Sequence, residues 1–423
     1  MILEVSWSDF RFFHGENTLS FSADARTKRL LSNAYPLEGR RLLKSVGIFG
    51  ANNSGKSNIV ALFSLLKKVL SGSKDFVCNR ALFGDAHRTR FSLTYNNHDG
   101  AGYFRYEFVY DSLQKRFPYE KLTAIRYYEA GTPLLETIFE KDQDQKRFFA
   151  LGEEHAEILS LIPSSLPILY SLELSSGPFA PLERYRASLE ALGDSLEIVK
   201  MFNVPLDKTV AMLKSGEEEK HRFILSFLQD ADLSIEDISY DPAPLKGNGG
   251  GEIDEKVLED FQERPESGHL LTRYGGHSVP SLYFDSNGTK KIEAFASYLY
   301  EALKEGKTLI VDELDNGLHY KLTRAIVSAF NNIANEKGQL LFTAHDLLLM
   351  DEKNLWRKDQ IYFLERTPEK ARLFPLKEAT ASLGGPREVS NLPKRYNHGD
   401  FIAVPTPDFV KEVLSLREKK ERQ

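Results

Sequence analysis

The chain has 423 residues, and its length and composition already exclude several classes of protein. The length predicts two or three structural units, and 41% hydrophobic with 27% charged residues is typical of a folded globular protein. The 55 Lys and Arg residues against 61 Asp and Glu give a net charge of −6, so no global positive field exists to hold nucleic acid. The single cysteine, Cys78, excludes an internal disulfide and a zinc site built from cysteines.

Apolar runs in the sequence are too short for a membrane span. None approaches the roughly 18 consecutive apolar residues that a transmembrane helix needs. The start, MILEVSWSDF, lacks the basic residues and the long apolar run of a signal peptide. We therefore expect a soluble, cytoplasmic protein with no membrane partner.

The first 141 residues show mostly strand patterns. Alternation and aromatic content predict a strand over residues 2–13 and a second strand from about Thr18. The apolar run SVGIF at 45–49 predicts a buried strand, and the spacing of apolar residues over 59–70 predicts a helix that Gly72 stops with a positive φ. Three β-rich segments from Arg90 to about Lys141, separated by turn signals, predict an antiparallel meander.

The middle of the chain changes character. Residues 146–235, including the segment SLEALGDSLEIVKMF, show helical spacing that prolines interrupt, which favours a compact helical lid over a long coiled-coil arm. The tract KGNGGG at 246–251 predicts a flexible linker. We therefore divide the chain into an N-terminal lobe, a helical insertion with its linker, a C-terminal lobe and a charged tail, at residues 1–141, 142–251, 252–405 and 406–423.

The C-terminal lobe alternates helices with apolar strands. A helix of about 17 residues follows Asp285 and ends at Gly306, and the runs TLIVDE, QLLFTAH and QIYFL predict strands. This alternation is typical of a mostly parallel α/β sheet.

The clearest motif is GANNSGKS at 50–57, which fits the phosphate-loop pattern G-x-x-x-x-G-K-[ST] between a predicted strand and a predicted helix. In such a loop the backbone wraps a phosphate chain, Lys56 reaches the β and γ phosphates, and Ser57 ligates Mg²⁺. A chance glycine turn is the alternative, which the flanking strand and helix disfavour. The predicted nucleotide contacts are Gly50, Asn52, Asn53, Ser54, Gly55, Lys56, Ser57 and Asn58.

The strand LIVDE ends in adjacent carboxylates, Asp312 and Glu313, whose side chains point to opposite faces. Together with the phosphate loop, this pair predicts Asp312 as a Mg²⁺ ligand and Glu313 as the group that polarises the attacking water. Alone, such a pair is usually a solvated strand end.

His345 closes the next strand, where it would lie beside the terminal phosphate. A lone His in this position is more often structural or exposed.

The order of these motifs, with SWSDFRFF and GANNSGKSN at the start, resembles ABC-type ATPases of the SMC branch. The segments VDELDNGLH, FTAHD, RKDQIYFLE and YNHGDFIAVP are similar more closely to RloA or AbiLi ATPases of bacterial phage-defence loci. The resemblance covers roughly residues 1–130 and 265–405. It implies an α/β P-loop ATPase head with a mixed or parallel sheet, an antiparallel meander and a compact helical insertion.

By position, the resemblance assigns Ser286 and Gly288 to the ABC signature, although DSNGT departs from the usual LSGGQ. It matches Asn316–His319 to the D-loop, with His319 where Asp is usual. No Q-loop glutamine and no adenine-stacking group can be assigned.

The resemblance also implies partners. Two heads would close on ATP and Mg²⁺ as a homodimer or larger homo-oligomer, each phosphate loop facing the partner's signature. The expected function is an ATPase switch in an antiphage, abortive-infection system, with a separately encoded effector and a nucleic-acid or phage-derived trigger. A DNA-repair ATPase is the alternative, supported by Lys28, Arg29, Arg40, Arg41, Lys44 and the basic tail. A transporter subunit fits the meander and the late insertion less well.

Overall fold

The structure is a computed structural model that describes residues 1–37, 40–82, 86–97, 102–128, 132–231, 234–242, 269–350, 354–378, 392–399 and 401. Among these residues, no helix combines the length and the apolar character that crossing a membrane requires. The linker at 246–251 and the tail at 406–423 lie outside the described residues.

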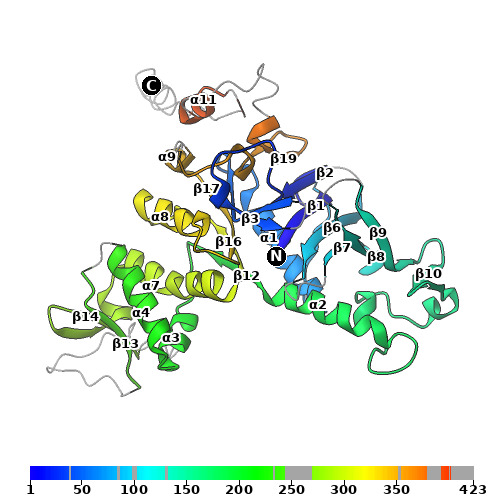
Figure 1. The fold of residues 1–423 in the computed structure, drawn as a ribbon, viewed down its shortest axis with the longest axis horizontal. Helices are drawn as coiled ribbons and strands as arrows, with labels where there is room; N and C mark the ends of the chain where they lie inside the picture. Colours follow the sequence, from blue (N-terminus) through cyan, green and yellow to red (C-terminus); the bar gives the residue numbers. More distant parts are fainter. Residues whose placement is uncertain are drawn as a thin grey trace, which may run out of the picture.

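Fourteen of the described strands form one mixed sheet (Figure 1). Their order is β11-β10-β9-β8-β7-β6-β1-β2-β19-β18-β5-β17-β16-β12. Their bounds are β1 Ile2–Phe10, β2 Phe13–Ser20, β5 Ser45–Phe49, β6 Arg88–Asn96, β7 Tyr103–Asp111, β8 Arg116–Arg126, β9 Leu134–Asp142, β10 Arg147–Ala150, β11 Glu153–Glu154, β12 Leu196–Lys200, β16 Thr308–Asp312, β17 Gln339–Ala344, β18 Ile361–Arg366 and β19 Ala371–Pro375.

The shorter elements complete the described fold. A three-stranded sheet contains β13 Asp237–Tyr240, β14 Leu270–Tyr274 and β15 His277–Pro280, and a hairpin pairs β3 Ala34–Leu37 with β4 Arg40–Leu43. The α-helices are α1 Lys56–Leu70, α2 Glu183–Asp194, α3 Asp207–Lys214, α4 Glu218–Asp230, α6 Ser281–Phe284, α7 Asn287–Tyr300, α8 Tyr320–Asn331, α9 Leu347–Met350 and α11 Leu392–Asn397. The turns of 3-10 or π type are Leu31–Asn33, Ala156–Ser160, Ile168–Tyr170, Ala180–Leu182, Glu301–Glu305 and Lys358–Gln360.

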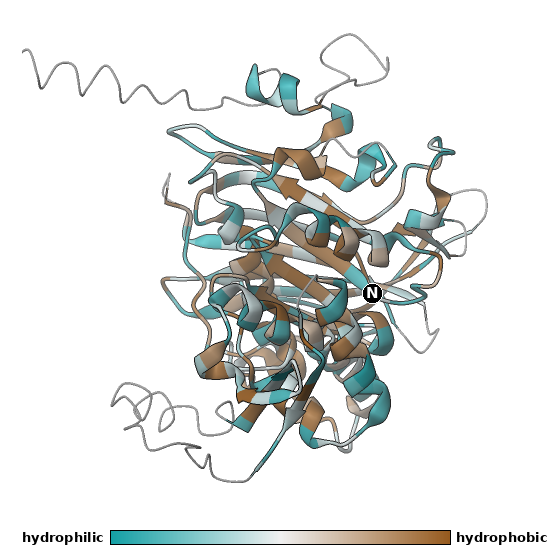
Figure 2. Cartoon of the chain, turned by 90° about the vertical axis from the view of Figure 1, so that its left-hand side faces the viewer, coloured by the Kyte–Doolittle hydropathy of each residue, from teal (hydrophilic) through white to brown (hydrophobic). Residues whose placement is uncertain are grey.

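The parallel centre of the sheet holds the core. Every residue of β5, β16 and β17 is buried, as expected for parallel strands that helices cover on both faces. Side chains alternate between the faces: Ile310 and Leu341 join the cluster that contains α1, while Val311 and Phe342 join the cluster that contains α8. Apolar residues accordingly fill the central strands in Figure 2. These are the strands that the runs SVGIF, TLIVDE and QLLFTAH predicted, and the predicted α/β fold class is confirmed.

The antiparallel half of the sheet is larger than the predicted meander. Strands β6, β7, β8 and β9 pair in sequence, which confirms the meander, and β1 joins its edge. The first predicted strand is too long, because the chain turns at Arg11, whose φ is 54°, and β2 begins at Phe13 rather than near Thr18. The stop predicted for the helix after the phosphate loop is confirmed, since Gly72 has φ 66° just past α1.

Three strands inside the predicted helical insertion, β10, β11 and β12, belong to the main sheet, so the helical prediction is wrong for all three. In SLEALGDSLEIVKMF, helix α2 ends at Asp194 and the residues LEIVK form β12, so the helical prediction is wrong for them. Strand β12 pairs in parallel with β16, with Lys200 opposite Asp312, and the N–H of Met201 donates to the carbonyl of Asp312. The β-branched Ile198 and Val199 suit this pairing better than a helix.

Ion pairs tie the helices after β12 to this edge of the sheet. Lys208 of α3 lies 3.1 Å from Glu197 of β12 and 2.6 Å from Glu301, which follows α7. Lys307, just before β16, contacts the same two carboxylates at 3.1 and 2.7 Å. Two cations and two carboxylates therefore link α3, β12 and the start of β16.

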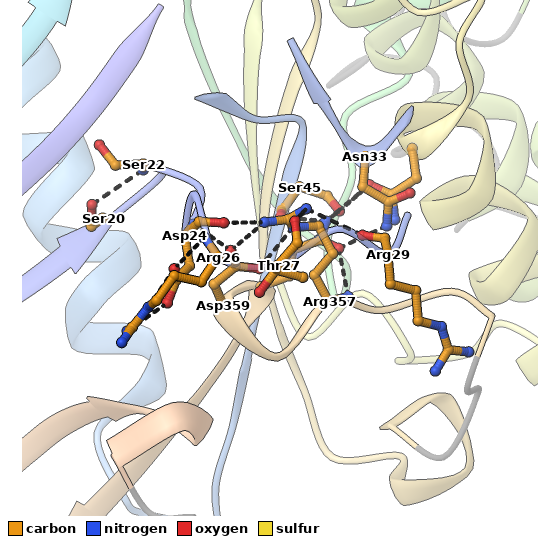
Figure 3. A network of polar contacts seen from close by, with 12 residues as sticks. Ser20, Ser22, Asp24, Arg26, Thr27, Arg29, Asn33, Ser45, Arg357 and Asp359 are labelled. Carbon is orange, nitrogen blue, oxygen red and sulfur yellow. Dashed lines mark hydrogen bonds and ion pairs between the residues drawn. The ribbon is translucent and has the colours of Figure 1, made fainter. Parts of the chain in front are cut away.

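A buried arginine connects the N-terminal segment after β2 to the loop before β18 (Figure 3). The guanidinium of Arg357 pairs with Asp359 at 2.7 Å and donates to the carbonyls of Asp24, Thr27 and Arg29. Asp359 in turn accepts the N–H of Asp24 at 2.7 Å. The side chains of Arg357 and Asp359 are 0% and 5% exposed, so each depends on the other for compensation of its charge.

The variant Arg357→Met should therefore be destabilised by about 3–5 kcal/mol, because it leaves Asp359 buried without its cation. Urea denaturation measures this loss. Arg26→Met is the matched control: Arg26 pairs with Asp24 of the same segment but is 90% exposed, and its loss should cost less than about 1 kcal/mol. Equal losses in the two variants would contradict the assigned role of Arg357.

Candidate functional site

The predicted site residues of three motifs meet at the carboxyl ends of three neighbouring parallel strands. The phosphate loop follows β5, Glu313 follows β16 and His345 follows β17. Strand β17 pairs with both β5 and β16, so the three ends lie at the same edge of the sheet. This is the edge where ligands bind in open α/β sheets.

As predicted, the motif at 50–57 lies between a strand and a helix: it follows β5, and α1 begins within it at Lys56. Glycine is required at Gly50, because a Cβ there would lie 2.7 Å from both the Leu364 carbonyl oxygen and the Ser54 hydroxyl. Gly55 has φ 106°, a conformation that side chains disfavour. The N–H groups of the first turn of α1 form an anion site of the kind that phosphates occupy.

The other predicted loop residues differ in their surroundings. Asn52, Asn53 and Ser57 are exposed, whereas Ser54 and Asn58 are buried. The buried hydroxyl of Ser54 has no hydrogen-bond partner among the residues that the structure describes. A buried polar atom without a partner in a loop of this shape fits a group that binds there, and phosphate oxygens supply such partners.

Lys56 lies within this loop rather than in solvent. Its ammonium group donates to the carbonyls of Gly50 and Ala51 at 2.6 and 3.0 Å, and it lies 3.3 Å from Nδ1 of His345. Burial lowers the pKa of Lys56 to about 8, and the nearby carboxylates Asp315, Glu313 and Asp312 oppose this change. The cation is thus positioned at the loop before any phosphate arrives.

The two carboxylates of LIVDE have different surroundings, because β16 ends at Asp312 and Glu313 follows it with φ 57°. Asp312 is 4% exposed, and its Oδ1 accepts a hydrogen bond of 2.8 Å from the hydroxyl of Thr343. Glu313 is half-buried; its Oε2 accepts from Nδ2 of Asn316 at 2.8 Å, and its Oε1 lies 3.7 Å from Nε2 of His345. Asp312 and Ser57 carry the oxygen atoms that would hold a Mg²⁺ ion together with nucleotide phosphates.

Two residues that the sequence did not single out hold this arrangement. The hydroxyl of Thr343 also accepts the N–H of Glu313 at 2.8 Å. The carboxylate of Asp315 accepts the N–H groups of His345 and Asp346 at 2.7 and 2.6 Å. Asp315 lies three residues after Asp312 in VDELD, and only the fold shows that it faces the end of β17.

The signature candidates Ser286 and Gly288 lie at the start of α7. Ser286 is the N-cap residue, and its hydroxyl accepts the N–H of Thr289 at 3.1 Å. A Cβ on Gly288 would lie 3.8 Å from the Gly317 carbonyl, which places the signature segment beside the predicted D-loop of the same chain. His319, the last residue of the predicted D-loop, is the N-cap of α8.

A buried carboxyl pair lies beneath the signature segment. Asp285 accepts hydrogen bonds from Thr272 and Tyr274 of β14 at 2.8 and 2.5 Å, and Ser281 donates to Glu293 of α7. Burial raises the pKa of Glu293 to about 8, and the neighbouring Asp285 adds to this effect. The neutral acid is therefore the stable form of Glu293 at pH 7.

The raised pKa predicts a pH-dependent stability. Because the folded-state pKa of Glu293 lies above its ordinary value of 4.5, the folded state binds more protons between about pH 4.5 and 8. The free energy of unfolding should therefore fall, relative to that of Glu293→Gln, by up to about 1.4 kcal/mol per pH unit over this range. Urea denaturation at several pH values tests this prediction, with the exposed Glu336→Gln as control. A constant difference between wild type and Glu293→Gln would refute it.

A comparison with protein-family models identifies the family of the chain. Residues 45–351 match the model of the family described as "AAA domain, putative AbiEii toxin, Type IV TA system". The chain therefore belongs to this family. The search of curated proteins found no significant match.

Solved structures that are similar to the chain include the SMC head domain from Thermotoga maritima, at 13% identity and a TM-score of 0.38, with 88% of this chain and 98% of that chain covered. An Smc head bound to the C-winged helix domain of ScpA has 14% identity and a TM-score of 0.41, with 90% of this chain and 99% of that chain covered. An Smc head with an extended coiled coil, bound to the C-terminal domain of ScpA derived from Pyrococcus furiosus, has 14% identity and the same TM-score, with 90% and 98% covered.

The family match places an AAA domain over residues 45–351, which include the phosphate loop and the strand LIVDE. The assignment to the SMC branch of ABC-type proteins stays a prediction. The closer resemblance to RloA or AbiLi ATPases stays a prediction.

Proposed function

We propose that the chain is an ATP-hydrolysing switch of a bacterial antiphage system that closes as a head-to-tail dimer on ATP and controls a separately encoded effector. The observation that carries the enzymatic part is the convergence of Lys56, Asp312, Glu313 and His345 at one edge of the sheet. The family description, which names a putative toxin of a toxin–antitoxin system, supports the defence setting.

In this proposal each side chain has a distinct task. The loop N–H groups and Lys56 hold the β and γ phosphates, and Ser57 and Asp312 hold Mg²⁺, which neutralises charge on the phosphate oxygens. Glu313 accepts the proton of the attacking water. His345 lies between Lys56 and Glu313, so its position depends on both the loop and the base.

The partner's signature segment completes the site in the dimer. Ser286 and the free N–H groups at the start of α7 form an anion site for the partner's terminal phosphate. Nucleotide state then sets the distance between the two heads, and the effector responds to that change. Binding of a phage-derived molecule or a nucleic acid would trigger the switch.

The alternative, a DNA-repair ATPase, loses part of its support in the structure. Lys44 is 3% exposed and donates to the Asn332 carbonyl, and the guanidinium of Arg40 stacks on Tyr127 at 3.4 Å. Two of the five basic residues near the N-terminus are therefore occupied within the fold rather than displayed for phosphates.

ATP turnover by purified protein tests the enzymatic proposal. Lys56→Ala and Glu313→Gln should each lose at least about 100-fold in kcat, because they remove the phosphate-binding cation and the general base. Lys68→Ala is the matched control, since Lys68 lies on the same helix and is 48% exposed. Undiminished turnover by Glu313→Gln would contradict the assigned base.

The oligomeric state of the same samples tests the switch. Glu313→Gln should accumulate as an ATP-bound dimer that sedimentation resolves from the nucleotide-free protein, because it binds ATP without hydrolysing it. A mass that ATP leaves unchanged would contradict closure on nucleotide.

Phage plating on cells that express the chain with the genes adjacent to its own tests the proposed antiphage role. Protection against phage should be lost with Lys56→Ala.

A further inference from the structure

Two hydrogen bonds connect the signature helix to the proposed general base. Nζ of Lys291, on α7, donates to Oδ1 of Asn316 at 2.9 Å. Nδ2 of the same amide donates to Oε2 of Glu313 at 2.8 Å. A single side chain, Asn316, thus bridges a lysine of the helix that follows the signature segment and the carboxylate that follows β16.

The chemistry of the three groups gives this bridge a direction. An ammonium group has only donors and an ionised carboxylate has only acceptors, whereas a primary amide has both. Lys291 therefore requires the oxygen of Asn316 on its own side, which places the NH₂ group toward Glu313. With Lys291 removed, rotation of the amide by 180° would turn its oxygen toward the carboxylate and break the hydrogen bond.

The backbone around Asn316 is shaped for these contacts. Glu313 has φ 57°, and its N–H is held by the Thr343 hydroxyl. Gly317 has φ 79°, and a Cβ there would lie 3.1 Å from Nζ of Lys291. The left-handed turn at Glu313 and the missing side chain at Gly317 together let the ammonium group reach the amide.

We propose that Asn316 is a positioning residue for Glu313 and that Lys291 selects the orientation of its amide. This inference rests on the ATP hydrolysis proposed above. Asn316 holds Oε2 of Glu313, which leaves Oε1, on the side of His345, to face the attacking water. Lys291 lies five residues after Ser286 on the same helix, α7. The position of α7 therefore sets the orientation of the Asn316 amide and, through it, of Glu313 in the same chain.

Asn316→Asp tests the first part of the inference. The substitution keeps the size of the side chain but removes the donor and places a second carboxylate beside Glu313. We expect kcat for ATP to fall about 10- to 100-fold, as for a misplaced catalytic group. The dissociation constant for a fluorescent ATP analogue should change less than about 2-fold, because neither Asn316 nor Glu313 holds phosphates in the proposed site. A merely structural role would instead lower kcat and affinity together, in step with thermal stability.

Lys291→Met tests the second part. This variant keeps the length of the side chain without a donor, and kcat should fall about 3- to 10-fold, whereas Lys291→Arg, which keeps donors, should retain most of the activity. Lys304→Met is the matched control, since Lys304 follows α7, is 52% exposed and pairs with Glu219. In the Asn316→Asp background no amide remains to be oriented, so adding Lys291→Met should change kcat less than about 2-fold.

The possible outcomes distinguish failure of this inference from failure of the proposed ATP hydrolysis. Wild-type turnover with an unaltered kcat in Asn316→Asp, or an equal effect of Lys291→Met in both backgrounds, overturns the inference and leaves the ATPase intact. Absence of turnover in wild type, or full turnover in Lys56→Ala, overturns the ATPase proposal itself and this inference with it.

Discussion

The alignment of β16 with β17 is the constraint on which the site depends. Val311 pairs with Phe342, so the strand ends bring the hydroxyl of Thr343 to Asp312 and to the N–H of Glu313 at once. A shift by one residue would turn Asp312 to the opposite face and part Glu313 from the hydroxyl that holds its N–H. The burial of every residue in both strands opposes such a shift, because each side chain would then enter the wrong layer of the core.

Strong local patterns made much of the fold predictable. The runs SVGIF, TLIVDE and QLLFTAH each have an unbroken apolar centre, which is typical of strands that are buried on both faces. The phosphate loop could be predicted because its glycines, lysine and serine occur in a short fixed spacing. By contrast, LEIVK is separated from helix α2 by Ser195 alone, and its strand state depends on pairing with β16, more than 100 residues away.

The residues that support the site could not be predicted from the sequence, because their roles also depend on contacts between elements that are distant in the chain. Asp315, Thr343 and Lys291 belong to no spaced motif, and their partners lie on other elements. Only Asn316 was anticipated, through its place in the D-loop. Its contact with Lys291 depends on the crossing of α7 over the loop after β16, which tertiary packing determines.

The place of β12 gives the segment after the meander a mechanical role. Because β12 is hydrogen-bonded along β16 up to Asp312, and Lys208 fastens α3 to both Glu197 and Glu301, a load applied to α3 is transmitted to the strand that carries the proposed Mg²⁺ ligand. In a parallel pair pulled along its axis, the hydrogen bonds share the load and yield together rather than one by one. The helical segment after β12 is thus connected to the site through β12. A force that a binding partner applies to this segment would act on β16.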